Sequence, residues 1–343
     1  MRPASAVDLR SDTVTLPTPD MRRVMAQAKV GDDVYDEDPT VIELEHLAAG
    51  LAGKQAGLFV PSGSMANLIA QMVHADRGSE VVLGEASHAV LYEVGAGAAI
   101  AGVQYSVIPG DGRFTAEQAR ERIKQPTFHT PGTSLLWIEN THNMGGGTIF
   151  PTAEIKAIAA VAREAGLPLH MDGARVFNAV VASGETLREV ARDVDSLSFC
   201  LSKGLGAPVG SVLVGTREFR TRAHRFRKML GGGMRQVGIL AAAGIYALEH
   251  HVERLAEDHR RARRLAETLA EWPGVSVDVS AVETNIVMVD LHEANATDLA
   301  RLCAERGVLF HALTPRRLRL VTHLDVDDAH IDRALEVISA ALG

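Results

Sequence analysis

The sequence has little of several features that define whole classes of protein. Its 343 residues include only two cysteines, Cys200 and Cys303, which lie far apart. This count excludes a disulfide framework and a cysteine-based zinc motif. Residues 1–10 lack the apolar core of a signal peptide, and no later stretch is an uninterrupted apolar run long enough to span a membrane. We therefore expect a cytoplasmic protein with no membrane partner.

Basic tracts are also scarce. The formal net charge is −8, charges of both signs are interspersed, and lysine and arginine gather only in short clusters such as residues 220–228. A nucleic-acid partner is therefore not expected. The sequence has no internal repeat and no low-complexity linker, and its 46% hydrophobic content suffices for a continuous core. These features favour an enzyme that acts on a small molecule.

Apolar, β-rich segments alternate with helical patterns over the first 250 residues. This alternation is typical of a mainly parallel sheet covered by helices on both faces, so we expect an α/β fold. Helices between the strands include 64–75, 115–123 and 152–165. The seven predicted strands are 56–61, 80–83, 103–108, 134–139, 167–171, 196–201 and 211–214.

The pattern changes near residue 250. Apolar residues recur at helical spacing from Ala247 to Glu271, where Pro273 and Gly274 end the run, which predicts one long helix bridging two domains. We predict a large domain over residues 1–250, with an N-terminal arm, and a small C-terminal α+β domain over 251–343, joined by a packed hinge. The small domain's predicted elements are strands 275–279, 285–291, 308–313 and 318–322 and helices 297–306 and 327–342.

A lysine and an aspartate near the ends of apolar strands suggest the chemistry. Lys203 lies where an apolar strand leads directly into a glycine-rich turn, and Asp172 ends another apolar strand. A lysine amine can hold the aldehyde of pyridoxal phosphate as a Schiff base. An aspartate beside the pyridine nitrogen keeps that nitrogen protonated and the ring an electron sink. Most lysines are surface residues and most strand-end aspartates are caps, so the pair, rather than either residue, indicates this cofactor.

Two further segments fit such a site. Ser62, Gly63 and Ser64 lie between a predicted strand and a predicted helix, where backbone amides can bind a phosphate that approaches closely at the glycine. The same residues would also serve as an ordinary helix cap. His88 follows another strand end, where its ring could stack on the pyridine ring, transfer a proton, or pack against its neighbours.

Two arginines are candidates for binding an amino-acid carboxylate. A guanidinium makes two parallel hydrogen bonds to a carboxylate, so Arg175 or Arg319 could fix the orientation of the substrate's Cα bonds and thereby select the bond that breaks. For Arg319 the alternative is an exposed strand residue. Ser11 and Asp12 could add donors or caps.

Other loops leave their roles open. Lys228 and Arg235 flank the glycine-dense segment 229–234, which could approach a ligand or a partner subunit. Tyr35 lies in a loop where packing and a substrate contact fit equally well. We identify no metal ligands, and whether a cation binds is left open.

Together these motifs resemble those of the low-specificity L-threonine aldolases. The resemblance implies the aspartate aminotransferase-like fold (fold type I) of pyridoxal phosphate enzymes. It also implies cleavage of L-threonine, L-allo-threonine and related β-hydroxy-α-amino acids to glycine and an aldehyde. The alternative is another fold type I enzyme, such as a β-eliminating lyase, that breaks a different bond at Cα. The segments that carry the likeness are 8–15, 30–35, 139–143, 170–175, 200–205, 227–236 and 319–323.

The resemblance also implies roles for individual residues. Lys203 would hold the cofactor covalently, Asp172 would face the pyridine nitrogen, and His88 would stack on the ring. The turn 62–64 would hold the phosphate. The substrate carboxylate would be bound by Arg175, Arg319 and Ser11.

The family resemblance extends to the assembly. In this family the active site lies between subunits of a homotetramer, so Lys228 and Arg235 would reach the site of a neighbouring chain. His129 is the nearest match to a family histidine that faces the substrate side chain. Three departures from the family pattern are the serine-rich turn at 62–64, Asp36 where glycine is usual, and Gly132 at a position that is often basic.

Overall fold

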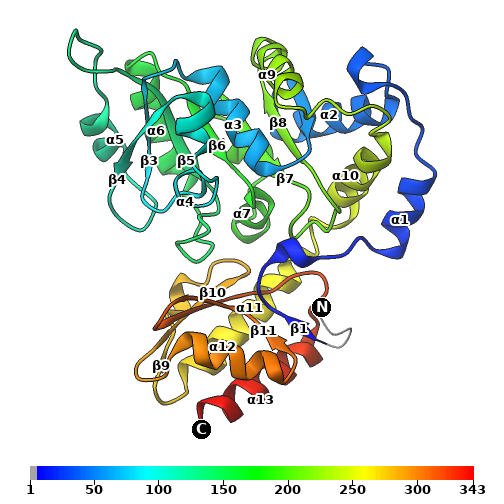
Figure 1. Ribbon diagram of the computed structural model, residues 1–343, viewed down its shortest axis with the longest axis vertical. Helices are drawn as coiled ribbons and strands as arrows, with labels where there is room; N and C mark the ends of the chain where they lie inside the picture. Colours follow the sequence, from blue (N-terminus) through cyan, green and yellow to red (C-terminus); the bar gives the residue numbers. More distant parts are fainter. Residues whose placement is uncertain (1–5) are drawn as a thin grey trace.

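The computed structural model, which describes residues 6–343, contains a large seven-stranded sheet and a small four-stranded sheet (Figure 1). The large sheet has the strand order β2-β8-β7-β6-β5-β3-β4, and β8 is antiparallel to both neighbours while the other pairs are parallel. The predicted mainly parallel α/β fold is confirmed. The strands are β2 (Ala56–Val60), β3 (Glu80–Gly84), β4 (Gln104–Ile108), β5 (Thr133–Glu139), β6 (Leu169–Asp172), β7 (Ser196–Cys200) and β8 (Ser211–Gly215).

Strand β5 shows why both faces of this sheet are covered. Its alternate residues Leu136 and Ile138 pack into one apolar core, and Leu135 and Trp137 into another. Within residues 6–343 no helix is both long and apolar enough to cross a membrane. The helices are α1 (Pro19–Ala26), α2 (Pro39–Ala52), α3 (Gly63–His74), α4 (His88–Leu91), α5 (Ala116–Arg122), α6 (Thr152–Glu164), α7 (Val176–Ser183), α8 (Leu187–Val190), α9 (Arg217–Met229) and α10 (Gly238–His250).

The small sheet is antiparallel, has the order β12-β13-β10-β9, and forms a separate apolar core with three helices. The N-terminal strand β1 (Val7–Asp8) joins this part of the molecule by pairing in parallel with β11 (Val308–Leu309). The predicted boundary at residue 250 stays a prediction. The other elements are α11 (Leu255–Ala270), β9 (Val275–Ser276), β10 (Ile286–Leu291), α12 (Ala296–Glu305), β12 (His311–Thr314), β13 (Arg317–Val321) and α13 (Asp328–Leu342).

The prediction of one long helix from Ala247 to Glu271 is wrong, because the chain turns at residues 251–254 between α10 and α11. His251 is buried in this turn, and its Nδ1 lies 2.7 Å from the carbonyl oxygen of Leu205. The apolar residues of α10 pack in the core of the large sheet, whereas those of α11 from Ala262 onward pack in the core of the small sheet. Helical spacing alone could not reveal that the run serves two cores.

Two predicted strands also differ from the structure. The predicted strand 308–313 is split at the buried residue Phe310, where the chain passes from β11, beside β1, to β12, beside β13. The predicted strand 275–279 is only the short β9. The side chain of Asp278 accepts hydrogen bonds from the backbone amides of Ser280 and Ala281 and so starts a turn of 3-10 helix there.

Candidate functional site

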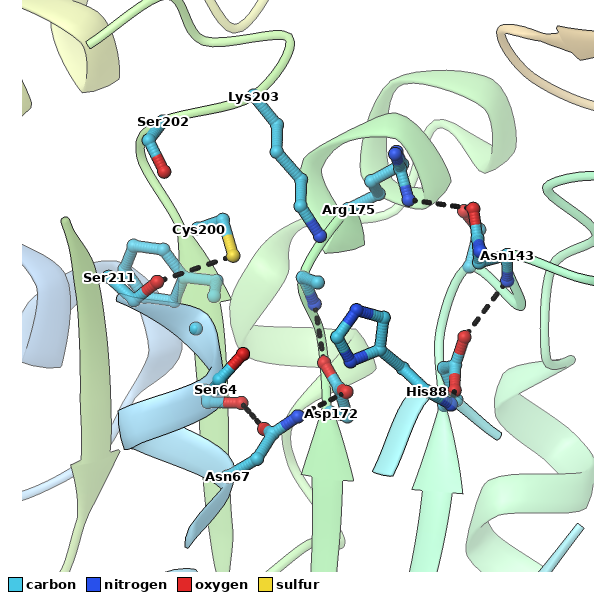
Figure 2. A pocket seen from close by; sticks show the side chains of 16 residues that line it. Ser64, Asn67, His88, Asn143, Asp172, Arg175, Cys200, Ser202, Lys203 and Ser211 are labelled. Atoms are coloured by element: carbon cyan, nitrogen blue, oxygen red, sulfur yellow. Dashed lines mark hydrogen bonds between the residues drawn. The ribbon is translucent and has the colours of Figure 1, made fainter. Parts of the chain in front are cut away.

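The carboxyl ends of the central strands bring several of the predicted residues together in one cavity. Asp172 ends β6, His88 begins the helix after β3, and Ser64 lies in the first turn of the helix after β2. Lys203 follows β7, and Figure 2 shows its side chain extending into the cavity, where its amine lies above Asp172 and His88. The cavity therefore contains an amine, a carboxylate and an imidazole.

Asp172 is buried and held in place by two neutral donors. Its Oδ2 accepts a hydrogen bond of 2.7 Å from Nδ2 of Asn67, and its Oδ1 accepts one of 3.0 Å from the backbone amide of Ala174. Asn67 is itself oriented, because Ser198 Oγ donates to its Oδ1 at 3.1 Å. A buried carboxylate fixed in this way is prepared for a cationic partner in the cavity.

His88 contacts two glutamates. Its backbone amide donates to Glu139 Oε2 at 2.7 Å, and its ring Nδ1 lies 2.9 Å from Glu93 Oε1. Burial would lower the pKa of His88, but the hydrogen bond with Glu93 and the charge of Asp172 outweigh burial and raise that pKa above its usual value. Ligand atoms of His88, Glu93 and Asp172 lie within 4.8 Å of one another, a spacing that could hold a metal ion. Nδ1 and Oε1, however, already bond each other.

The N-terminus of α3 forms one wall of the cavity. Ser62 is the helix N-cap, and its Oγ accepts a hydrogen bond from the amide of Met65 at 3.2 Å, while Gly63 and Ser64 line the cavity. A Cβ at Gly63 would lie 2.8 Å from Sγ of Cys200, so only glycine fits without displacement. Backbone amides at the start of a helix of this length bind phosphate well. Together with the amine and Asp172, this wall fits a cofactor with a phosphate, an aldehyde and a basic ring nitrogen.

Arg175 is engaged by a residue from the N-terminal arm. Its Nε and Nη2 donate to the two carboxylate oxygens of Asp12, each at 2.7 Å, and both side chains are buried. Burial would raise the pKa of Asp12, but the Arg175 guanidinium holds it well below its usual range. The Nε and Nη2 edge of Arg175, one of its edges that can make two parallel hydrogen bonds, is thus occupied. Its Nη1 does not contact Asp12 and donates to Asn143 Oδ1 at 3.3 Å.

A second cavity of about 460 Å³ adjoins the first and extends toward the small sheet. Arg319 on β13 and Ser11 on the N-terminal arm line it. Arg319 donates from Nη1 to Asn143 Oδ1 at 3.0 Å and from Nη2 to the carbonyl oxygen of Arg10 at 3.3 Å. The cavity is large enough for a small amino acid. The residues that line both cavities are His88, Asn143, Arg175 and Lys203.

Some residues with predicted roles lie outside both cavities of this chain, including Ser62, which caps α3 beside the first cavity. Tyr35 is 70% exposed, and Lys228, at the end of α9, is also exposed. Arg235 is exposed and forms an ion pair with Asp32, with Nη1 and Oδ2 2.9 Å apart. The loops that carry Tyr35 and Arg235 are joined by a backbone hydrogen bond from Asp33 to the carbonyl oxygen of Arg235.

His129 is also outside both cavities. It lies in the exposed loop between α5 and β5, where its backbone amide donates to Thr127 Oγ1. Its ring packs edge-on against Phe128, whose side chain is 96% exposed. Within one chain this loop does not contribute to the site.

The structure adds four residues that the sequence reasoning did not assign. Glu139 ends β5 and Asn143 follows it, so their position at the carboxyl edge of the sheet could have identified them. Asn67 lies one turn after Gly63 on α3, on the side that faces Asp172. Glu93 lies in an irregular segment after α4, and no periodic pattern marks it.

Comparisons with known proteins agree with one another. A family described as "Beta-eliminating lyase" matches residues 8–294. A low specificity L-threonine aldolase of Escherichia coli (strain K12) is 48% identical, covering 93% of this chain and 94% of that protein. A probable low-specificity L-threonine aldolase 2 of Arabidopsis thaliana is 45% identical over 96% of this chain and 95% of that protein. Among solved structures, a Leishmania major threonine aldolase has the same fold, with a TM-score of 0.85, 21% identity, and coverage of 98% and 99%.

Proposed function

The chain belongs to the low-specificity L-threonine aldolases, and on this premise we propose that it cleaves L-threonine and L-allo-threonine to glycine and acetaldehyde. Related β-hydroxy-α-amino acids would give glycine and the corresponding aldehyde. Pyridoxal phosphate is the cofactor. The observation that carries the proposal is the single cavity in which Lys203 and Asp172 meet the N-terminus of α3, next to a second cavity lined by Arg319 and Ser11.

The cofactor would be held at four points by residues of the first cavity. Lys203 Nζ would bind its aldehyde carbon, Asp172 its ring nitrogen, and Gly63 and Ser64 its phosphate. The His88 side chain would lie against the ring. When bound, pyridoxal phosphate supplies an electron sink for the electron pair left at Cα when a bond there breaks.

The substrate carboxylate would be bound by residues that converge from three parts of the chain. Arg319 comes from the small sheet, Ser11 from the N-terminal arm, and Arg175 from the loop after β6. Arg319 offers its guanidinium, whereas Arg175 contributes through Nη1 because Asp12 occupies its other edge. Such a clamp places the Cα–Cβ bond in the orientation in which it breaks.

His88 would receive the proton that the reaction releases from the β-hydroxyl group. The O–H bond breaks and its electron pair forms the aldehyde carbonyl. The Cα–Cβ bond breaks and leaves its electron pair at Cα, which then gains a proton to give glycine. His88 suits this task because it lines both cavities and its raised pKa makes the imidazole a stronger base than an ordinary histidine.

The active form would be a homotetramer in the cytoplasm. Lys228 and Arg235 are exposed and lie outside both cavities of their own chain, which supports the proposal that they reach the site of a neighbouring subunit. Tyr35 and His129 also lie outside both cavities, and they would contact the substrate or packing partners in a neighbouring subunit. Large exposed apolar side chains nearby support burial in an assembly. They include Met229 beside Lys228, Phe128 beside His129, and Leu91 and Val94 close to His88.

Product analysis tests this function. The purified protein, loaded with pyridoxal phosphate and given L-threonine, should form glycine and acetaldehyde in equal amounts. The Lys203→Ala variant should form neither and should lose the cofactor link that borohydride traps in the unsubstituted protein. Formation of an oxo acid and ammonia would instead favour the alternative, a β-eliminating lyase, which is also the description of the matching family.

A further inference from the structure

Glu93 is a buried carboxylate that lines neither cavity, yet it contacts the site from behind. Its side chain is 1% exposed. Its Oε1 lies 2.9 Å from His88 Nδ1 and accepts a hydrogen bond of 2.7 Å from Asn67 Nδ2. Its Oε2 has no hydrogen-bond partner among the residues that the structure describes. Burying a carboxylate with half of its acceptor capacity unused is costly, which suggests that its position serves a purpose beyond stability.

The backbone around Glu93 is unusual in two ways. Val94 has φ +54°, in the left-handed region that β-branched residues rarely adopt, and its side chain is 99% exposed, so packing within the chain does not offset the strain. A π-helical turn, Gly97–Ala101, follows almost directly. Turns of this kind occur frequently at functional sites. The segment is thus irregular at the point that directs residue 93 inward.

Asn67 links Glu93 to the carboxylate on the other side of His88. Its single amide nitrogen donates to Glu93 Oε1 and to Asp172 Oδ2, each at 2.7 Å. His88, Glu93, Asn67 and Asp172 therefore form one continuous chain of contacts. Among the described residues, other charged groups that face His88 include Lys203 and Arg175, which share both cavities with it, and Glu139, which binds its backbone amide.

We propose that Glu93 is a positioning residue for His88: its carboxylate accepts the Nδ1 hydrogen, fixes the ring plane, and leaves Nε2 as the nitrogen that takes the β-hydroxyl proton. The inference rests on the proposed function, because it concerns the step in which His88 receives that proton. An ionised Glu93 also stabilises the imidazolium that forms when Nε2 is protonated, as carboxylate partners of histidine do elsewhere. The raised pKa of His88 agrees with such a partner.

Glu93→Gln isolates this role, because glutamine keeps the shape and can still accept hydrogen bonds from Asn67 and His88 but carries no charge. We expect kcat for L-threonine to fall about 10- to 100-fold with KM changed less than about threefold, since the substrate clamp is untouched. Glu93→Asp, which keeps the charge one methylene further away, should recover part of the lost kcat.

A second measurement does not depend on turnover. Titration of the [13Cε1]histidine signal of His88, identified by its absence in His88→Asn, should show a lower pKa in Glu93→Gln than in the unsubstituted protein, with and without cofactor. Glu80→Gln is the matched control, because Glu80 is a buried glutamate at the opposite end of β3 that pairs with Lys124 at 2.9 Å. It should change neither kcat nor the His88 titration.

The two proposals fail in different ways. If the unsubstituted protein forms no glycine from L-threonine, the proposed function is wrong, whatever Glu93 does. If that protein is active but Glu93→Gln keeps its kcat, or leaves the His88 titration unchanged, the positioning role is wrong and the function stands. Equal losses of kcat in Glu93→Gln and Glu80→Gln would also overturn the inference, since they would reveal a general effect of removing a buried carboxylate.

Discussion

Asp12 and Arg175 lie 163 positions apart in the sequence and form a buried ion pair with two hydrogen bonds of 2.7 Å. The N-terminal arm thus supplies the counter-charge for an arginine in the main site. Burial would lower the pKa of Arg175, but Asp12 outweighs that effect and raises it. Arg175 is consequently fixed in orientation before any substrate enters.

Asp12→Asn should lower the free energy of unfolding by about 3–5 kcal/mol, because it leaves a guanidinium buried without its counter-charge. Urea denaturation at neutral pH measures the loss. The folded pKa of Asp12 is depressed, so the stability it contributes is present above the unfolded pKa of about 4 and is lost as pH falls toward the folded pKa. The difference between variant and unsubstituted protein should therefore shrink in acid.

A control for this prediction is Glu164→Gln, which breaks the ion pair of Arg120 with Glu164, in which each side chain is 58% exposed. Exposed pairs contribute about 0–1 kcal/mol, so this change should have little effect. A loss in Asp12→Asn no larger than in Glu164→Gln would contradict the view that Arg175 depends on Asp12.

Gly63→Ala should weaken cofactor binding at least about tenfold, because the new methyl group would lie 2.8 Å from Cys200 Sγ and displace the wall that receives the phosphate. The double variant Gly63→Ala, Cys200→Ala separates two causes. If crowding against the sulfur is the cause, removing it restores binding, as measured by the absorbance of bound cofactor. If the phosphate itself needs the space at residue 63, binding stays weak in the double variant.

Arg319→Lys should raise KM for L-threonine about 10- to 100-fold, because an ammonium group cannot make two parallel hydrogen bonds to a carboxylate. The effect on kcat should be smaller. Arg317→Lys is the control on the same strand, since Arg317 pairs with Asp290 and lines neither cavity of the site. A KM unchanged in Arg319→Lys would remove Arg319 from the substrate clamp.

Mixing inactive subunits tests whether sites are shared. Lys203→Ala lacks the covalent lysine, and Lys228→Ala with Arg235→Ala lacks the groups expected to reach a neighbouring site. Each homo-oligomer should have little activity, but hybrids formed by mixing and refolding should regain part of it, because some sites then combine intact halves. Size-exclusion chromatography with light scattering should give four chains per particle. Hybrids without activity would mean that Lys228 and Arg235 act in the site of their own chain or in no site.

Much of the fold could be predicted, because the strands of the large sheet are buried on both faces and appear as short apolar runs. The turn between α10 and α11 could not, since the apolar spacing continues through it while the packing partner changes. The split at Phe310 depends on pairing with β1, three hundred positions away in the sequence.

The candidate site shows the same division. Lys203, Asp172 and His88 were predictable because strand ends in α/β folds gather ligand-binding groups. The ion pair of Arg175 with Asp12 was not predictable, because a local sequence pattern does not show which distant side chain binds a given guanidinium. Glu93 could not be predicted, because it contacts His88 rather than lining a cavity and lies in a segment without regular structure.

The parallel pairing of β1 with β11 has a practical consequence for handling the protein. Through this pairing, the strand just before Ser11 and Asp12 is anchored beside the small sheet, so we expect a proteolytic nick or a bulky fusion at this end to disturb the proposed substrate clamp. Helix α13 ends away from both cavities at the far side of the small sheet (Figure 1). Purification tags and immobilisation linkers therefore belong at the carboxyl terminus.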